Sequence, residues 1–159
     1  MVDVDKSFPW GFYDGASQSN VCGGGVILYF FYSYFFEMSM GLGEGTNNYA
    51  KLLNLKILLM FALEKGCRNL AFFGDSLNVI NWVNGIQQCR AIGLSNILDI
   101  IKEVLILFDS FQCRHVFREN NKEVDCASKE GSRMAQGAWL IKEHKDGEIQ
   151  EYYHESFII

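Results

Sequence analysis

The first part of the chain carries short apolar runs of the length that strands have. The aromatic run 10–14 ends at the turn pair Asp14-Gly15, and this predicts a strand that delivers an acid at its end. The glycine run 23–25 leads into the segment VILYFF, and after a tip near Ser33 the chain continues as YFFEMSMGLG. Because both segments are rich in residues that favour strands, the pattern predicts three consecutive strands, the last two forming an antiparallel hairpin.

From residue 47 the apolar positions take the spacing of an amphipathic helix. Thr46 precedes this pattern as an expected N-cap and Gly66 follows it as an expected stop, so we predict a helix over 47–65. The next apolar run, 69–74, is too short for a helix and predicts a fourth strand.

Further helices and one strand are predicted in the rest of the chain. A helical pattern over 76–84 stops at Gly85, and Ser95 is expected to cap another helix. The segment 111–117 predicts a fifth strand, and Asn121 is expected to cap the last helix.

The predicted order places three strands before the first helix, which differs from the strict alternation of doubly wound nucleotide-binding folds. We therefore predict an α/β fold in which helices flank a mixed sheet, with one domain over 8–136. The segment 137–159 is mixed and polar, and we treat it as a C-terminal tail whose packing the sequence does not predict. The aromatic hairpin residues within 29–36 are expected to form a buried sheet face, and a second apolar face would be covered by the tail or by a partner.

Composition narrows the classes of protein to which the chain belongs. With 159 residues, 49% hydrophobic and 21% charged, it has the size and composition of one globular domain. Its net charge of −5 lacks the basic excess of a protein that grips phosphate backbones, so any contact to nucleic acid is expected to be local. Five cysteines without a Cys-x-x-Cys pair favour a reducing compartment. The acidic N-terminus is unlike a secretory signal, and the apolar stretch 26–36 is too short to span a bilayer, so we expect an intracellular protein, cytoplasmic or nuclear, that does not enter a membrane.

Three aspartates stand where predicted strands end or helices begin: Asp14, Asp75 and Asp125. Taken singly, each has a structural explanation, because Asp is common in turns before Gly, at N-caps and in the first turn of helices. Taken together, carboxylates from separate elements meet the requirement of a two-metal site, and oxygen ligands suit Mg²⁺ or Mn²⁺. The three aspartates are therefore our candidates for a catalytic, metal-ligating set.

Four segments in order along the chain carry a resemblance to a known family. They read FYDGAS followed by GGGV, TNNYAKLLNLKILLMFALEKG, FFGDSLNVINWV and FRENNKEVDCASKEG, and they lie within residues 10–134. In this order they resemble the type 1 ribonuclease H domains, in particular the reverse transcriptase-like branch that is common in plants. The resemblance implies a ribonuclease H-like fold with a five-stranded mixed sheet, cleavage of the RNA strand of an RNA–DNA hybrid, and a divalent-metal site made of Asp, Glu, Asp and Asp.

Lys51 departs from the family pattern. The resemblance places Asp14, Asp75 and Asp125 at three of the four acid positions, whereas Lys51 stands where the family has its Glu. A protonated Lys cannot ligate a cation and repels it, and an unperturbed Lys titrates at about pH 10.4. Two hypotheses follow: either metal-dependent hydrolysis by this chain is weakened, or the chain is an inactive module of the same fold that binds nucleic acid or a protein. Under the second hypothesis Lys51 pairs with Asp14 or Asp75 and occupies the position of a metal.

The resemblance also implies contacts to the hybrid. It assigns Asn47 and Asn48 to the minor groove, where 2′-hydroxyls are displayed, although helix capping explains an Asn there equally well. Backbone N–H groups around Gly15 and the side chain of Arg118 are candidates for phosphate contacts, and Asn121 belongs to the segment before the last acid. The nucleic-acid-binding candidates are therefore Gly15, Asn47, Asn48, Arg118 and Asn121.

Two further sequence features bear on this resemblance. His115 lies near the place where some ribonucleases H carry a loop His, but here it falls within a predicted strand, so we expect it to pack rather than to catalyse. Between Trp82 and Asp99 the only basic residue is Arg90, so the basic helix with which some bacterial relatives grip the hybrid is missing, and the affinity is expected to be modest.

Other classes of protein remain as alternatives. A phospho-acceptor signalling domain also collects acids at strand ends, but it needs alternating strands and helices from the start, and the three initial strands argue against it. A retroelement-derived fragment without function is a further alternative. For the favoured family we expect a monomer that binds an RNA–DNA hybrid or another nucleic acid.

Overall fold

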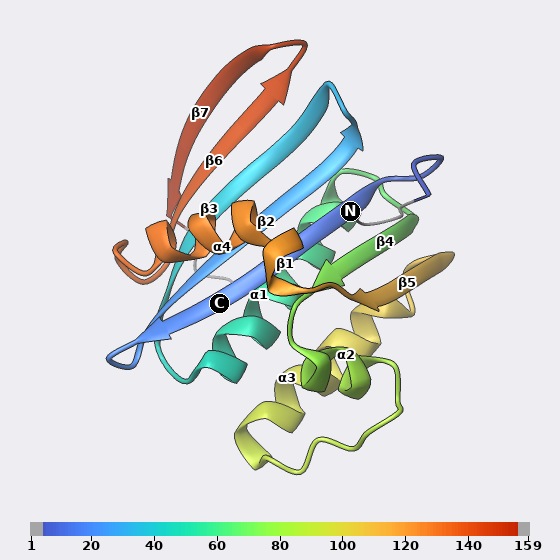
Figure 1. Cartoon of the computed structure of the whole chain (residues 1–159), viewed down its shortest axis with the longest axis vertical. Coiled ribbons are helices and arrows are strands. Elements are labelled where there is room, and N and C mark those ends of the chain that lie inside the picture. The colour runs from blue at the N-terminus through green and yellow to red at the C-terminus, as the bar shows by residue number, and fades with distance from the viewer. Residues whose placement is uncertain (1–4, 156–159) are drawn as a thin grey trace.

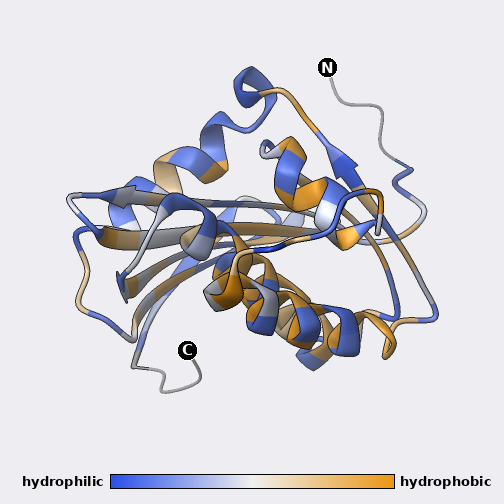
Figure 2. Ribbon diagram, turned by 90° about the horizontal axis from the view of Figure 1, so that it is seen from below, coloured by the Kyte–Doolittle hydropathy of each residue, from blue (hydrophilic) through white to orange (hydrophobic). Residues whose placement is uncertain are grey.

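A mixed β-sheet forms the centre of the fold. The structure is a computed structural model that describes residues 5–155. Its strands are β1 (Trp10–Gln18), β2 (Val21–Phe31), β3 (Tyr34–Glu44), β4 (Asn69–Gly74), β5 (Ser110–His115), β6 (Ala138–Lys145) and β7 (Glu148–Glu155). Its helices are α1 (Asn47–Glu64), α2 (Leu77–Val83), α3 (Ile92–Leu105), the 3₁₀ helix η1 (Arg118–Asn120) and α4 (Lys122–Gly131). In Figure 1, α4 lies in front of the sheet and α1 and α3 lie behind it, and Figure 2 shows the strands between these helical layers.

The strand directions confirm the mixed sheet. β1, β2 and β3 pair antiparallel, whereas β4 runs parallel to β1 and β5 runs parallel to β4. The expected number of five strands is wrong, because the order across the sheet is β5-β4-β1-β2-β3-β6-β7. The two additional strands come from the segment treated as a tail, and β6 pairs antiparallel with β3 and β7 with β6. A local signal for this hairpin exists in the sequence, since Asp146-Gly147 joins the strands with positive φ at both residues, as a two-residue turn of this kind requires.

Two predicted boundaries are wrong for physical reasons. β1 does not end at Asp14, because its pairing with the glycine-rich strand β2 continues from Asp14↔Gly25 to Gln18↔Val21. The turn instead falls at Ser19-Asn20, where both residues have positive φ. Ser95 is not an N-cap, because α3 begins at Ile92 and the Ser95 hydroxyl donates to the Ile92 carbonyl oxygen inside the helix.

The other predicted helix boundaries are confirmed within one or two residues. Thr46 caps α1, its hydroxyl oxygen accepting from the Tyr49 N–H at 3.2 Å, and Ser76 caps α2 in the same way through Val79. The glycines expected to stop the first two helices, Gly66 and Gly85, have positive φ. No helix in the part of the chain that the structure describes is both long and apolar enough to cross a membrane.

Glycines in β1 and β2 allow helices to approach both faces of the sheet. A Cβ on Gly15 would lie 2.3 Å from the Ala50 carbonyl carbon of α1, and one on Gly25 would lie 2.4 Å from the Val124 carbonyl oxygen of α4. Side chains would clash with the helix backbones at these positions, so only glycine permits this packing. The close approach of α1 brings its first turns against β1, and that contact positions the candidate site.

The main core lies between the sheet and helices α1 and α3, and it includes Phe36 from the aromatic hairpin. Residues of the opposite face form a row of aromatic contacts across β1, β2, β3 and β6. Tyr29 stacks on Trp10 at 5.0 Å and lies 4.8 Å from Phe35, which in turn stacks on His144 at 4.2 Å. His144 is the cross-strand partner of Phe35, so β6 of the tail extends this aromatic face sideways and does not cover it. The expectation of burial is wrong for Phe31 and Tyr32, which are 66% and 68% exposed because they lie at the hairpin tip.

We predict that Gly15→Ala destabilises the fold by about 3 kcal/mol or more, because the new methyl group meets helix backbone that cannot rotate away. The matched control is Gly93→Ala in α3, where an added Cβ has no neighbour within 4 Å. That change should stabilise the protein by about 0.5 to 1 kcal/mol, since Ala is the better helix former. Urea unfolding of the three proteins measures both effects, and equal stabilities would contradict the close α1–β1 packing.

Candidate functional site

The Lys51 ammonium group forms the centre of the candidate site. Its Nζ lies 2.5 Å from Oδ1 of Asp14 and 3.2 Å from Oδ1 of Asp75. The three residues come from separate parts of the fold: Asp14 from the middle of β1, Lys51 from the second turn of α1, and Asp75 from the position directly after β4. The hypothesis that Lys51 pairs with one of these acids is therefore confirmed, and it pairs with both.

This ion-pair cluster is largely withdrawn from water. The side chains of Asp14 and Asp75 are 4% and 6% exposed, and that of Lys51 is 16% exposed. Burial raises the pKa of Asp14 to about 6, against the lowering effect of the Lys51 ammonium. Burial acts to lower the pKa of Lys51, but Asp14 and Asp75 outweigh it and hold this pKa above its ordinary value. Lys51 is therefore charged at neutral pH.

Asp125 adjoins the same cluster from α4. Burial acts to raise its pKa, but a hydrogen bond from Lys129, another with Asp14, and the charges of Lys129 and Lys51 keep the pKa below the ordinary value. The Lys129 Nζ lies 3.0 Å from Oδ2 of Asp125, one helical turn away. The structure therefore brings all three candidate aspartates into electrostatic contact around Lys51.

The residues present do not fit the divalent-metal site that the resemblance implies. Carboxylate oxygens are the ligands that Mg²⁺ and Mn²⁺ prefer, but the Lys51 ammonium bonds one oxygen each of Asp14 and Asp75 and repels a cation placed between them. Within residues 5–155, no group of three or more His, Cys, Asp or Glu side chains is arranged to hold a metal ion. The arrangement is that of a charge-compensated ion-pair cluster.

Asn54 supports the cluster and was missed by the sequence reasoning. It is fully buried, and its Nδ2 donates to the carbonyl oxygens of Asp14, at 2.7 Å, and Gly25. These bonds tie α1 to β1 and β2 next to the acid. The sequence signal for this role was an Asn inside the apolar helix run LLNLKILL, because an amide that is buried with such a run needs hydrogen-bond partners.

His115 packs against the same region. It ends β5, as expected for a strand residue, and its Nε2 lies 3.2 Å from the Asp75 carbonyl oxygen. Its ring also meets Phe117 edge to face. These contacts hold the backbone that presents the Asp75 carboxylate.

Some candidate nucleic-acid contacts are engaged inside the protein. The Gly15 N–H donates to Oδ1 of Asp14 at 2.9 Å, and Oδ1 of Asn47 accepts from the Ser17 N–H at 2.8 Å. Asn48 is half-buried in the first turn of α1, and Arg118 is exposed on η1. Asn121 precedes α4 as its cap residue but makes no side-chain cap, and instead its Nδ2 donates to the Tyr13 carbonyl oxygen at 3.3 Å.

Comparison with known proteins agrees with this fold. The chain matches the model of the reverse transcriptase-like family over residues 13–131. It is 26% identical to RNase H1 from the archaeon Halobacterium salinarum, with a TM-score of 0.75, covering 80% of this chain and 98% of that one. No curated protein matches.

Two further solved structures share the fold. The N-terminal RNase H domain of a Mycobacterium tuberculosis protein is 22% identical with a TM-score of 0.74, covering 79% of this chain and 93% of its own. LC11-RNase H1, isolated from compost and solved in complex with an RNA/DNA hybrid, is 21% identical with a TM-score of 0.68, covering 79% and 96%. The chain thus has a ribonuclease H-like fold, extended by β6 and β7.

We predict that Lys51→Met destabilises the protein by about 3 to 5 kcal/mol at pH 8, because it leaves two buried carboxylates without their cation. The pKa of Asp14, already about 6, would rise further. An acid whose pKa is higher in the folded than in the unfolded state lowers the free energy of unfolding as the pH rises from the unfolded pKa, near 4, through the folded pKa. The loss of stability in Lys51→Met should therefore shrink toward pH 4.

Thermal unfolding from pH 4 to 8 measures this dependence. The control is Lys56→Met on the same helix, since Lys56 forms no ion pair among residues 5–155. A pH-independent deficit for Lys51→Met, or equal deficits for both variants, would contradict the ion-pair account.

Proposed function

Because the chain belongs to the reverse transcriptase-like family and has a ribonuclease H-like fold, we propose that it binds RNA–DNA hybrid without hydrolysing it. The observation that carries this proposal is the Lys51 ammonium, bonded to Asp14 and Asp75. It supports the second of the two sequence-based hypotheses, the binding module, over a weakened metal-dependent endoribonuclease.

The charges explain the expected lack of hydrolysis. Two-metal hydrolysis needs carboxylates whose negative charge is available to the ions that hold the attacking and leaving oxygens. In this chain Lys51 already compensates the buried carboxylates of Asp14 and Asp75, and Lys129 compensates Asp125. A metal ion would have to displace an ammonium group from a site with little access to water, which makes loading unfavourable.

Binding does not require those charges. The first turn of α1 presents Asn47 and Asn48 beside the end of β1, and the Asn47 amide nitrogen remains a donor while its oxygen is bonded to Ser17. Amide donors suit the minor groove of a hybrid, where 2′-hydroxyl and base-edge acceptors lie. Arg118 on η1 supplies an exposed cation for a phosphate. The relative solved with an RNA/DNA hybrid supports the choice of ligand.

The proposal also covers where in the cell the chain acts and in which oligomeric state. The five cysteines are all free thiols in the structure, four of them buried, which supports an intracellular, reducing location. We propose that the chain acts there as a monomer on a nucleic acid rather than on a membrane.

We predict that the purified chain binds a fluorescein-labelled RNA–DNA hybrid in EDTA, with micromolar affinity that weakens as salt is raised. Fluorescence anisotropy measures binding, and a denaturing gel of the same samples with added Mg²⁺ or Mn²⁺ measures cleavage. Asn48→Ala and Arg118→Ala should each weaken hybrid binding about three- to tenfold. The matched control is Arg90→Ala, between α2 and α3, which should leave hybrid binding unchanged. Metal-dependent cutting that Asp75→Asn abolishes would overturn the proposal.

We predict that Lys51→Glu gains more thermal stability from Mn²⁺ than wild type does. The substitution restores the acid of the family pattern and changes the local charge from +1 to −1. Without metal the variant should melt below wild type, because an added carboxylate repels the others, and metal binding then stabilises it by mass action. Thermal shift across Mn²⁺ concentration reads both effects. If the two proteins respond identically, Lys51 does not control metal loading.

A further inference from the structure

We propose that the outer edge of strand β7 binds an extended peptide segment by strand addition, and that this segment carries a lysine or arginine with an apolar residue two positions to either side. The inference is independent of hybrid binding, because β2, β3 and β6 separate β7 from β1 and the ion-pair cluster. In Figure 1, β7 forms one margin of the sheet, and within residues 5–155 it pairs with β6 alone. The other side of β7 therefore presents backbone donors and acceptors to which a further strand can bond.

The backbone groups on this open side belong to alternate residues of β7. In an antiparallel pair, residues that exchange hydrogen bonds with the neighbouring strand alternate with residues whose N–H and C=O groups point away from it. The two-residue turn between β6 and β7 is flanked by the pair Lys145↔Glu148, and the pair that flanks such a turn is the hydrogen-bonded kind. Counted from that pair, the residues whose backbone groups point to the open side are Ile149, Glu151 and Tyr153.

β7 lacks the features that usually keep an edge strand from pairing. It is eight residues long, its register with β6 continues without a shift, and it contains no proline, lysine or arginine. Residues 148–154 are all exposed. The opposite edge, β5, has only six residues and includes Arg114. β7 is therefore the edge that admits another strand more readily.

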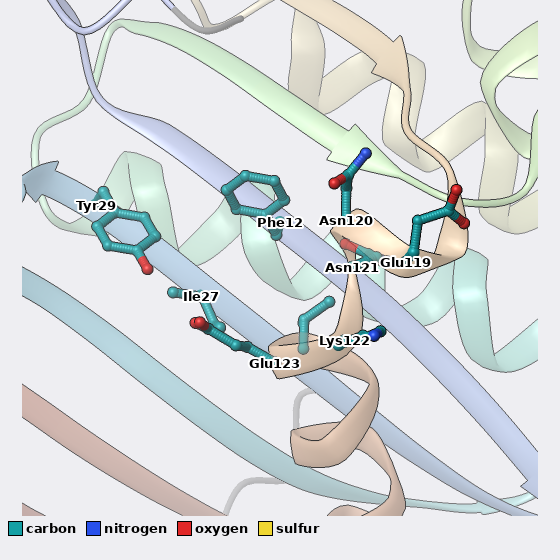
Figure 3. Close-up of a pocket in the computed structure, with 9 residues that line it drawn as sticks. Phe12, Ile27, Tyr29, Glu119, Asn120, Asn121, Lys122 and Glu123 are labelled. Atoms are coloured by element: carbon teal, nitrogen blue, oxygen red, sulfur yellow. The ribbon is translucent and has the colours of Figure 1, made fainter. Parts of the chain in front are cut away.

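The side chains beside the open edge favour a partner of positive charge. Figure 3 shows Ile27 on the sheet face that α4 covers, and residues directly opposite each other in neighbouring strands have side chains on the same face. From Ile27 the cross-strand pairs continue to Glu37, Lys142 and Glu151, so these side chains form one row on the α4 side. The charges in this row alternate in sign and end with the acid at the open edge. The next position in the row therefore favours a cation.

Glu151 is the residue that this cation would meet. It is exposed, and within the part of the chain that the structure describes it forms no ion pair. Its neighbours on the same face, Ile149 and Tyr153, are 57% and 77% exposed. Apolar side chains opposite these two would remove apolar surface from water while the cation pairs with Glu151. The open backbone edge thus indicates a strand as ligand, and the side chains independently indicate its apolar–cation–apolar pattern.

A second copy of the chain is the competing occupant, because one β7 strand can pair with another. When residues 148–154 of two copies pair antiparallel, Glu151 lies opposite Glu151, and like charges directly opposite each other destabilise a strand pair. When residues 149–155 pair instead, Glu151 lies opposite Tyr153. Neither register supplies a cation to Glu151, so the charges favour a basic strand of different sequence.

The test uses the whole ¹⁵N-labelled chain and the peptide acetyl-TVTKTVT-amide, which can place its lysine opposite Glu151 and its valines opposite Ile149 and Tyr153. We expect saturable NMR shifts of the β7 amides with a Kd of about 1 mM. At saturation, hydrogen exchange should slow at least about fivefold at the amides of these three residues, because they gain partners. The amides of Gln150 and Tyr152 face β6 and should change little. This alternation distinguishes strand addition from charge attraction to the surface.

Control peptides and variants separate the backbone from the charge. The same peptide with its valines and lysine N-methylated keeps the charge but loses the N–H groups that face β7 in an antiparallel pair, so it should bind at least about tenfold more weakly. The acidic peptide acetyl-TVTETVT-amide should bind about fivefold more weakly than the lysine peptide. Glu151→Lys should reverse the order of the lysine and glutamate peptides. The matched control Glu103→Lys, exposed on α3, should keep the wild-type order.

Three outcomes would overturn the proposal. Equal binding of the N-methylated peptide would show attraction to the surface without strand addition. Equal binding of the lysine and glutamate peptides to wild type would show that Glu151 does not select the partner. Concentration-dependent shifts of the β7 amides in the absence of peptide, together with a dimer in analytical ultracentrifugation, would assign the edge to a second copy. None of these outcomes depends on whether the chain binds hybrid, which the anisotropy measurement decides separately.

Discussion

The structure depends on one electrostatic constraint, which is that two buried carboxylates share one partly buried ammonium group. Asp14 lies in β1 and Asp75 directly follows β4, and the side chains of both are almost completely buried. A buried ion pair of this kind contributes little net stability compared with apolar residues, but removing one partner is strongly destabilising. Lys51 therefore adds little net stability, but it is required for Asp14 and Asp75 to stay buried in charged form.

Glycines in β1 and β2 allow Lys51 to reach the two buried acids. Lys51 reaches Asp14 only because α1 lies close against β1, and α1 lies close because Gly15 has no side chain to meet the Ala50 backbone. On the other face Gly25 gives α4 the same access, which brings Asp125 and Lys129 toward the cluster. Asn54 joins α1 to the sheet, because its side chain donates hydrogen bonds to the carbonyl oxygens of Asp14 in β1 and Gly25 in β2. The close packing of the helices on the sheet and the ion pairs of Lys51 thus depend on each other.

The sequence predicted those features that depend on local chemistry. Thr46 and Ser76 cap helices because their own hydroxyls reach the next turn, and the pairing of Lys51 with acids followed from charge and order along the chain. Features that depend on pairing partners were missed. β1 extends past Asp14 because β2 continues beside it, and the tail forms strands because β3 offers a free edge.

The way in which the three candidate acids are compensated determines what this cluster can bind. Around Lys51 every candidate acid has a cation within the chain, so the cluster is complete without a metal. Compensation within the chain removes the driving force for binding a metal ion at this cluster. A Lys at the position where the family pattern has Glu therefore compensates the acids of this cluster from within the chain.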